Sequence, residues 1–248
     1  MSRPGGLVVP LIWLVLLLGG CLAMDIFEPL FRWIEPDSRS VIYQRADFLT
    51  LLGKHLLVVS VAALLSIVIG VGAAVAVTRR WGRDFLPLVA QLAAIGQTFP
   101  PVAVLALAVP VLGFGTLPVI VALLLYGLLP IVRNTLVGLE GVSAEVREAA
   151  IGMGMTQRQL LWHVEMPLAA PVIVAGIRTS VTINIATAAI GATMGASNLG
   201  DPIISGIVNG NTAHVLQGAV LIALLALFVD SLFAWLQPDR ASISLASA

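Results

Sequence analysis

Six long apolar segments constrain this chain more than any other feature. They cover residues 7–24, 55–78, 85–111, 117–133, 167–194 and 215–236. A helix needs roughly 20 apolar residues to cross the hydrocarbon core of a bilayer. Only 10% of the residues are charged, against about 25% in a typical soluble domain. The sequence therefore predicts an all-α integral membrane protein with about six transmembrane helices.

The third segment contains two consecutive prolines, Pro100 and Pro101. Proline removes a backbone donor and clashes with the preceding turn, so it bends or breaks a helix. The two halves are each too short to cross a membrane alone. We therefore predict one kinked or partly unwound span, in which neighbouring helices satisfy the freed backbone groups.

The loops differ in basic residues, and this difference predicts an orientation. The loops after the second and fourth segments are basic, whereas those after the third and fifth carry no Lys or Arg. The basic residues are Arg79, Arg80, Arg83, Arg133, Arg147 and Arg158. Because cytoplasmic loops are enriched in such residues, we expect both chain termini in the cytoplasm. The external loop before residue 55 is an exception, since it also holds four basic residues.

The chain is expected to form one helical membrane domain. Its parts are a first span with an external loop (1–54), a membrane core (55–236) with short cytoplasmic helices at about 143–163, and a cytoplasmic tail (237–248). The letters "LGGC" at 18–21 resemble a lipoprotein cleavage box. Five further spans follow, so we expect an uncleaved first span.

Several functional classes find no support in the sequence. The single cysteine, Cys21, excludes an internal disulfide, and the three histidines lack metal-ligand spacing. No GxxxxGKS or GxxxxGKT phosphate loop occurs, so we expect no ATP site in this chain. The formal net charge of zero gives no sign of nucleic-acid binding.

The loop between the fourth and fifth segments has the features of short helices. Ser143 is a suitable cap for the first. Thr156 and Gln159 fit a capping box that begins a second, with Gly154 in a turn between them. Pro167 suits the first turn of the fifth span. Such amphipathic helices either lie in the headgroup interface or bind a partner.

Part of this loop resembles the EAA motif of binding-protein-dependent ABC importer permeases. "EAA" at 148–150 is followed after three residues by Gly154, after nine more by Val164, and then by Met166 and Pro167. The family has Ile and Leu where this chain has Val164 and Met166, but the spacing matches throughout. In that family the loop is a coupling helix, which rests in a groove of a separate ATPase subunit.

The resemblance implies a coupling role for five residues. Ala149 and Ala150 are small enough for close seating in a groove. Glu148 offers an acceptor to the partner, and Gly154 permits the turn. Arg158 is either a contact at the rim of the groove or a solvated charge.

Longer stretches resemble the permeases of osmoprotectant importers, and the YehW-like branch most closely. They include "IGQTFPPVAVLALAVPVLGFG" (95–115), "LLLYGLLPIVRNT" (123–135) and "LGDPI" (199–203) within residues 85–207. The resemblance implies a type I ABC importer transmembrane-domain fold in a bacterial inner membrane, without catalytic chemistry or a cofactor in this chain. It also implies partner ATPase subunits that bind ATP, a second permease chain, an external binding protein and a solute such as glycine betaine, carnitine or choline.

Two ionisable residues lie within the last two spans. Arg178 in the fifth needs a partner at its depth in the membrane, and Asp230 in the sixth lies within reach of a long side chain. We expect a structural ion pair between them. A role of Arg178 in solute contact is the alternative, although a cationic side chain would repel a quaternary ammonium group.

Other polar residues are candidates to line a pathway. Gln97 and Thr98 lie beside the double proline, where irregular backbone normally faces a cavity. Asn184 and Thr187 lie along the fifth span, where interhelical hydrogen bonds are the alternative role. The external stretch 191–214 is expected to meet the binding protein, to form a gate or to be a plain loop.

Two rival functions stay open at this point. One is the same ATP-driven machine with another small solute, such as an amino acid. The other is a secondary transporter, which would work without an ATPase subunit and would leave the EAA spacing unexplained.

Overall fold

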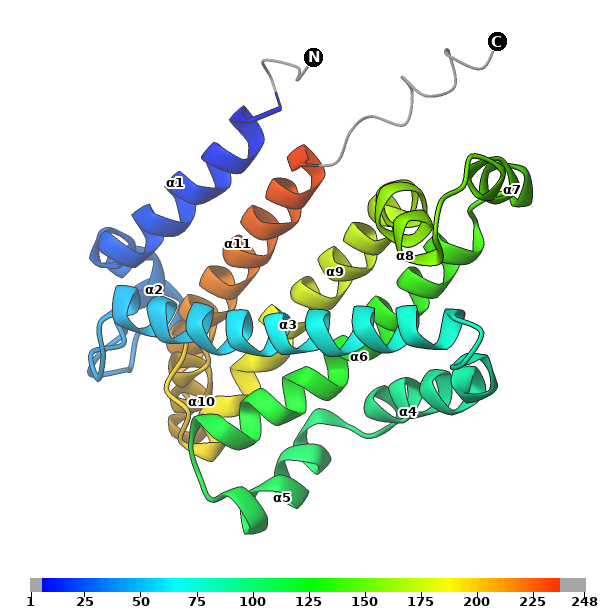
Figure 1. The fold of residues 1–248 in the computed structure, drawn as a ribbon. Helices are drawn as coiled ribbons and strands as arrows, with labels where there is room; N and C mark the ends of the chain where they lie inside the picture. The colour runs from blue at the N-terminus through cyan, green and yellow to red at the C-terminus, as the bar shows by residue number, and fades with distance from the viewer. Residues whose placement is uncertain (1–5, 237–248) are drawn as a thin grey trace.

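The computed structural model describes residues 6–236, and every regular element in that range is helical (Figure 1). The tail expected in the cytoplasm, 237–248, lies outside the described residues. The α-helices are α1 Val8–Leu22, α2 Glu28–Ile34, α3 Phe48–Thr78, α4 Leu86–Thr98, α5 Pro101–Leu112, α6 Thr116–Glu140, α7 Ala144–Gly152, α8 Gln157–Leu160, α9 Met166–Ala188, α10 Asp201–Asn209 and α11 Thr212–Leu236.

Four continuous helices are long and apolar enough to cross a membrane: Phe48–Thr78, Thr116–Glu140, Gln157–Met194 and Thr212–Leu236. Two bent pairs add to these. Val8–Leu22 and Met24–Ile34 meet at 82°, and Arg83–Thr98 and Pro101–Leu112 meet at 98°. Counting each pair as one span gives six, in line with the number expected from the sequence.

The break between α4 and α5 falls at the double proline. Phe99 and Pro100 adopt extended backbone there. α6 supplies partners for this irregular region, because the Tyr126 hydroxyl donates to the Phe99 carbonyl. In return, the Gln97 amide donates to the Tyr126 carbonyl at 2.7 Å. The kink expected in the third segment is therefore present, and a neighbouring helix compensates part of its backbone.

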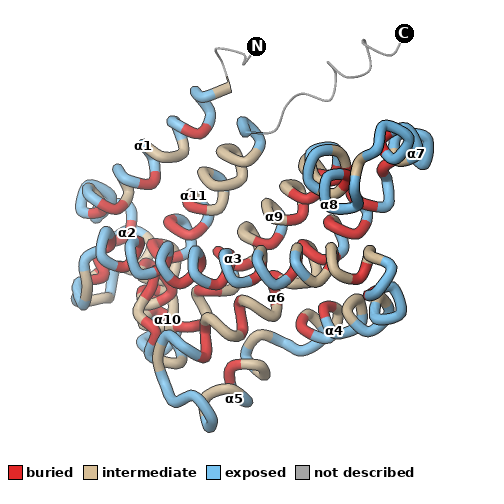
Figure 2. The backbone as a smooth tube through the Cα atoms, viewed as in Figure 1, coloured by how far each residue is buried: buried red, intermediate tan, exposed pale blue. Residues whose placement is uncertain are grey.

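Helices α3, α6 and α9 pack together at the centre of the bundle, and α1 packs on α11 at one side (Figure 1). Buried residues gather along these contacts, whereas much of α4, α5 and α7 is exposed (Figure 2). Gly127 lies where the three helices approach closely. A Cβ atom there would lie 2.7 Å from Ser180 Oγ of α9 and 2.8 Å from Ser66 Oγ of α3. Small residues permit such close packing of membrane helices.

The two ends of the bundle differ in their elements. Figure 1 places α7, α8, the start of α1 and the end of α11 at one end, and α2 and α10 at the other. The first end carries the arginine-rich loops, so it is the end that the sequence predicts to face the cytoplasm.

The second span differs from the sequence expectation at its start. α3 begins at Phe48, so the boundary expected between 54 and 55 falls inside a helix. Asp47 caps it, because its carboxylate accepts a hydrogen bond of 2.9 Å from the Thr50 backbone N–H. The expected segment began only after Lys54, although the first turns of α3 are themselves largely apolar, with Phe48, Leu51 and Leu52 buried.

Candidate coupling surface

The helix α7 begins as its sequence predicts. The Ser143 hydroxyl accepts from the Val146 backbone N–H at 3.4 Å, which satisfies one of the free donors at the helix start. Glu145 follows in the first turn. Hydrogen bonds from its own backbone N–H and from Ser143 lower the pKa of Glu145.

A glycine turn and a capping box connect α7 to α8. Gly154 has a φ of +83°, in the region that favours glycine. The Gln159 side chain accepts from the Thr156 backbone N–H at 2.9 Å, and the Thr156 hydroxyl accepts from the Gln159 N–H at 3.3 Å. The predicted starts of both helices and the glycine turn between them are therefore confirmed.

The expectation that the second helix ends near residue 163 is wrong. α8 continues through a π-helical turn, Leu161–Glu165, directly into α9. Pro167 explains the turn, because it lacks the N–H that would bond to the carbonyl four residues earlier and its ring crowds that carbonyl. A π turn carries one extra residue and absorbs this mismatch without ending the helix.

The side chains of α7 divide into an outward and an inward set. Val146, Ala149 and Met153 recur at helical spacing and are exposed, Met153 by 72%. Glu148, Gly154 and Arg158 are exposed as well. Ala150 is only 2% exposed, so it packs within this chain rather than facing outward as the EAA resemblance implies. We call Val146, Glu148, Ala149, Met153, Gly154 and Arg158 the α7–α8 surface.

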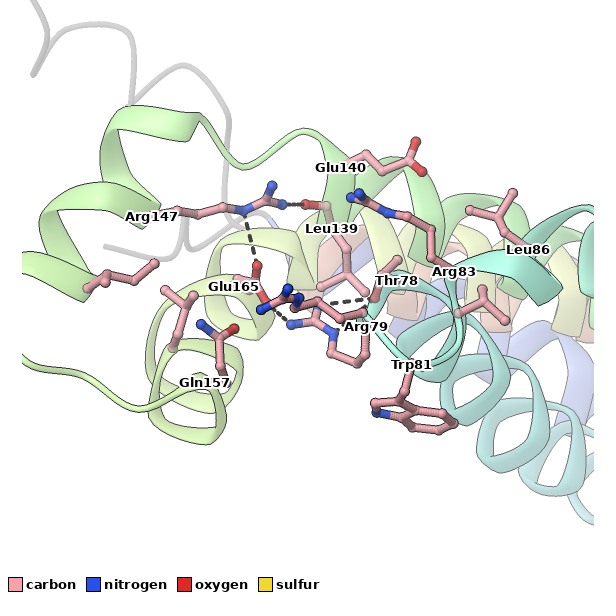
Figure 3. A pocket seen from close by; sticks show the side chains of 14 residues that line it. Thr78, Arg79, Trp81, Arg83, Leu86, Leu139, Glu140, Arg147, Gln157 and Glu165 are labelled. Carbon is pink, nitrogen blue, oxygen red and sulfur yellow. Dashed lines mark hydrogen bonds and ion pairs between the residues drawn. The ribbon is translucent and has the colours of Figure 1, made fainter.

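A charged cluster lies beside α7 at the edge of a cavity of about 460 Å³ (Figure 3). Arg79 Nη1 lies 2.7 Å from Glu165 Oε2, and Arg147 Nε lies 3.0 Å from Glu165 Oε1. Arg147 also donates to the Leu139 carbonyl. Each carboxylate oxygen of Glu165 therefore faces a different arginine. Glu165 is only 3% exposed, so these contacts are largely shielded from solvent. We call these three charged residues the Glu165 cluster.

No motif in the sequence marks Glu165 as a functional residue. One signal was available, because an acid that directly precedes an apolar span needs a cationic partner near the membrane. Its partners are far apart in the sequence, because Arg79 follows α3 and Arg147 lies in α7. Only the fold brings them together.

The candidate pathway residues do not form one group. Gln97 is bonded to α6, and Thr98 is exposed and donates to the Ile95 carbonyl. Asn184 is fully buried where α3, α6 and α9 meet, and its amide atoms have no hydrogen-bond partner among the described residues. Thr187 donates to the Ile183 carbonyl. A lining role for these residues stays a prediction.

Arg178 and Asp230 lie in direct contact. Arg178 donates from Nε and Nη2 to the two oxygens of Asp230, each at 2.6 Å. The pair joins α9 to α11 and does not involve α7.

Residues 66–242 match the family described as "Binding-protein-dependent transport system inner membrane component". This chain belongs to that family. The matched region includes α7, α8 and all three members of the Glu165 cluster. Membership places the protein in the bacterial inner membrane.

Relatives of this inner membrane component include several named permeases. It is 42% identical over 192 residues to the osmoprotectant import permease protein OsmY of Salmonella typhimurium, covering 77% of this chain and 81% of the relative. It is 39% identical over 182 residues to the glycine betaine/carnitine/choline transport system permease protein OpuCB of Bacillus subtilis, covering 73% and 83%. The choline permease protein OpuBD of Bacillus subtilis is 41% identical over 216 residues, covering 86% and 91%.

Solved ABC transporters share the fold of this inner membrane component. A chain of the inward-facing MetNI methionine ABC transporter matches with a TM-score of 0.66 at 22% identity, covering 75% of this chain and 93% of that one. An amino acid ABC transporter solved with histidines matches with a TM-score of 0.65 at 16% identity, covering 88% and 97%. The fold is thus that of type I ABC importer transmembrane domains, as the EAA resemblance implies.

Proposed function

We propose that this chain is the membrane-spanning permease subunit of an ATP-driven importer for an osmoprotectant such as glycine betaine. The observation that carries the solute class is the identity of about 40% to permeases named for osmoprotectants, glycine betaine, carnitine and choline. The chain forms the translocation pathway together with a second permease chain, identical or similar to it.

The α7–α8 surface is the proposed contact with a separate ATPase subunit. Val146, Ala149 and Met153 give it an exposed apolar stripe on a short helix. A helix that lays such a stripe into a groove is a common mode of recognition. Glu148 and Arg158 supply polar contacts around the stripe. ATP is bound and hydrolysed on that partner, and this chain carries out no covalent chemistry.

An external binding protein is the proposed source of solute specificity. Quaternary ammonium groups are commonly recognised by cages of aromatic side chains. Only 6% of this chain is aromatic, so a second protein that captures the solute and delivers it to the outer end suits this composition. The loop region around η4 (Ala189–Met194) and α10 lies at that end (Figure 1).

An importer of amino acids is the nearest rival. The solved transporters that share the fold handle amino acids, but their identities of 16–22% carry the fold alone. A secondary transporter is a rival of another class, and it would leave the exposed apolar stripe of α7 without a partner.

The test is uptake by the purified complex of permease, ATPase and binding protein in proteoliposomes. We expect radiolabelled glycine betaine to accumulate only when ATP is present inside the vesicles, on the side that carries the ATPase subunits. Unlabelled carnitine or choline should compete with this uptake. Methionine serves as the control competitor and should have no effect. Uptake without ATP, or competition by methionine in place of the quaternary ammonium solutes, would reject the proposal.

A further inference from the structure

Glu165 is the point at which separate segments of the cytoplasmic end meet. It lies directly before α9, and its carboxylate binds Arg79, the residue that caps the end of α3. The same carboxylate binds Arg147 of α7, which also donates to the carbonyl of Leu139 in the last turn of α6. The cluster therefore joins α7 to α3, α6 and α9, the three helices at the centre of the bundle (Figure 3).

Arg147 is the polar connection between α7 and these spans. Within residues 6–236, no other α7 side chain makes a hydrogen bond or ion pair to a membrane-spanning helix. Ala150 is the one buried side chain of α7. Few side-chain contacts therefore connect α7 to the membrane-spanning helices. The charged one is the contact between Arg147 and Glu165.

Burial makes this connection hard to open. The side chain of Glu165 is 4% exposed and that of Arg79 is 19% exposed. Separating a buried carboxylate from its partner leaves an uncompensated charge away from water, which is strongly unfavourable. The two arginines occupy different oxygens, so neither replaces the other. The cluster should therefore move as one unit when α7 is displaced.

We propose that Glu165 is a positioning residue for energy coupling, which passes displacement of α7 to the ends of α3, α6 and α9. The proposal rests on the proposed function of the α7–α8 surface. Asp230 is the comparison for a merely stabilising role, because its ion pair with Arg178 also holds α9 but does not touch α7. This difference supplies a matched control.

The test compares Glu165→Gln with Asp230→Asn in the complex with its ATPase and binding protein, reconstituted in proteoliposomes. Both changes replace a carboxylate by an amide of the same shape. The readouts are assembly by size-exclusion chromatography, ATP hydrolysis stimulated by glycine betaine with its binding protein, and glycine betaine imported per ATP hydrolysed. We expect import per ATP to fall about tenfold in Glu165→Gln, within the usual range of coupling effects, and by less than about twofold in Asp230→Asn.

A second variant keeps the test decisive if Glu165→Gln assembles poorly. Arg147→Gln leaves Glu165 paired with Arg79, and the Arg147 side chain is 35% exposed, so this variant should assemble. We expect the same fall in import per ATP. Import per ATP in the double variant of Glu165→Gln and Arg147→Gln should be no lower than in the worse single variant, because the effects of two residues that act through one contact do not add. Glu165→Asp, which keeps the charge on a shorter side chain, should give an intermediate ratio.

The outcomes separate this proposal from the one it rests on. Wild-type import per ATP in both Glu165→Gln and Arg147→Gln would overturn the role of Glu165, as would an equal loss in Asp230→Asn or losses that multiply in the double variant. Gly154→Val, which alters the α7–α8 surface and not the cluster, tests the proposed function itself. If Gly154→Val uncouples and Glu165→Gln does not, the role of Glu165 alone fails. If neither variant changes import per ATP, the coupling role of α7 fails as well.

Discussion

Arg178 of α9 holds Asp230 of α11 with two hydrogen bonds of 2.6 Å each, one to either carboxylate oxygen. Paired donation of this kind is the strong form of the arginine–carboxylate contact, because the planar guanidinium matches the carboxylate. The side chains are 30% and 41% exposed, so the pair is only partly shielded.

Loss of this pair should destabilise the protein moderately. We expect Asp230→Asn to lower the free energy of unfolding by about 1–2 kcal/mol, since the charge-assisted bonds become weaker ones. The melting temperature in detergent should fall by about 2–6 °C. Arg178→Lys should lose most of the same stability despite its retained charge, because lysine does not make the paired contact. An Arg178→Lys variant that melts with the wild type would contradict this account.

Gly154 should tolerate side chains poorly, in contrast to its neighbour Gly152. A β-branched residue at a φ of +83° is strained by about 1–3 kcal/mol. Gly154→Val should therefore distort the turn between α7 and α8 and lower ATP-driven uptake by about tenfold. Gly152→Val is the control, because Gly152 has open space within 4 Å and no positive φ. Equal uptake by the two variants would show that the turn geometry is unimportant.

Gly127 should tolerate no larger residue at the junction of α3, α6 and α9. The added methyl group of Gly127→Ala would lie 2.7 Å from Ser180 Oγ and 2.8 Å from Ser66 Oγ, so these closely packed side chains must shift. We expect a loss of about 1–3 kcal/mol, the usual effect of overpacking. Gly72→Ala in α3 meets nothing within 4 Å and should gain up to about 1 kcal/mol. Thermal unfolding of both variants in one detergent measures the contrast.

Asp201 should make the protein less stable as the pH rises. Burial raises the pKa of Asp201 above its ordinary value of 3.8, although hydrogen bonds from Asn198 and Ser197 act against this. The folded state then binds its proton more tightly than the unfolded state does. The stabilising contribution of protonated Asp201 is therefore fully present below the ordinary aspartate pKa. It is lost as the pH rises through the raised pKa of the folded state.

Asp201→Asn removes this dependence and keeps an acceptor for the Asn198 N–H. The variant should melt about 1–3 °C above the wild type at pH 7, with the difference shrinking as the pH falls toward 4. A difference that stays constant with pH would assign the effect to packing rather than to charge.

Local sequence signals predicted the elements better than the contacts between them. Apolar runs predict the spans, the double proline predicts the break after Thr98, and Thr156 with Gln159 predicts the start of α8. The contact between Arg178 and Asp230 was expected from their depths in neighbouring spans. These features depend on composition, caps and prolines, which act over a few residues.

The Glu165 cluster lay beyond such reasoning because its members are far apart in the sequence. Arg79 and Glu165 are 86 positions apart, and their contact depends on where α3 ends relative to α9. The inward position of Ala150 was missed for a similar reason, since the EAA resemblance gives a partner surface but not the rotation of α7. The start of α3 was missed because Lys54 interrupts the apolar run, although residues 48–53 before it are mostly apolar.

The π turn before α9 makes this region sensitive to its length. Deleting one residue from Leu161–Glu165 would restore the ordinary α-helical repeat. A second deletion has no extra residue to remove, so everything upstream, including Gly154 and α7, would then rotate by about 100° relative to α9. Substitutions at the exposed Trp162 or His163 leave this register intact, whereas an insertion, or a deletion of more than one residue, does not. The number of residues between Gly154 and Val164, which is nine, thus sets the angle at which the cytoplasmic helices meet the membrane.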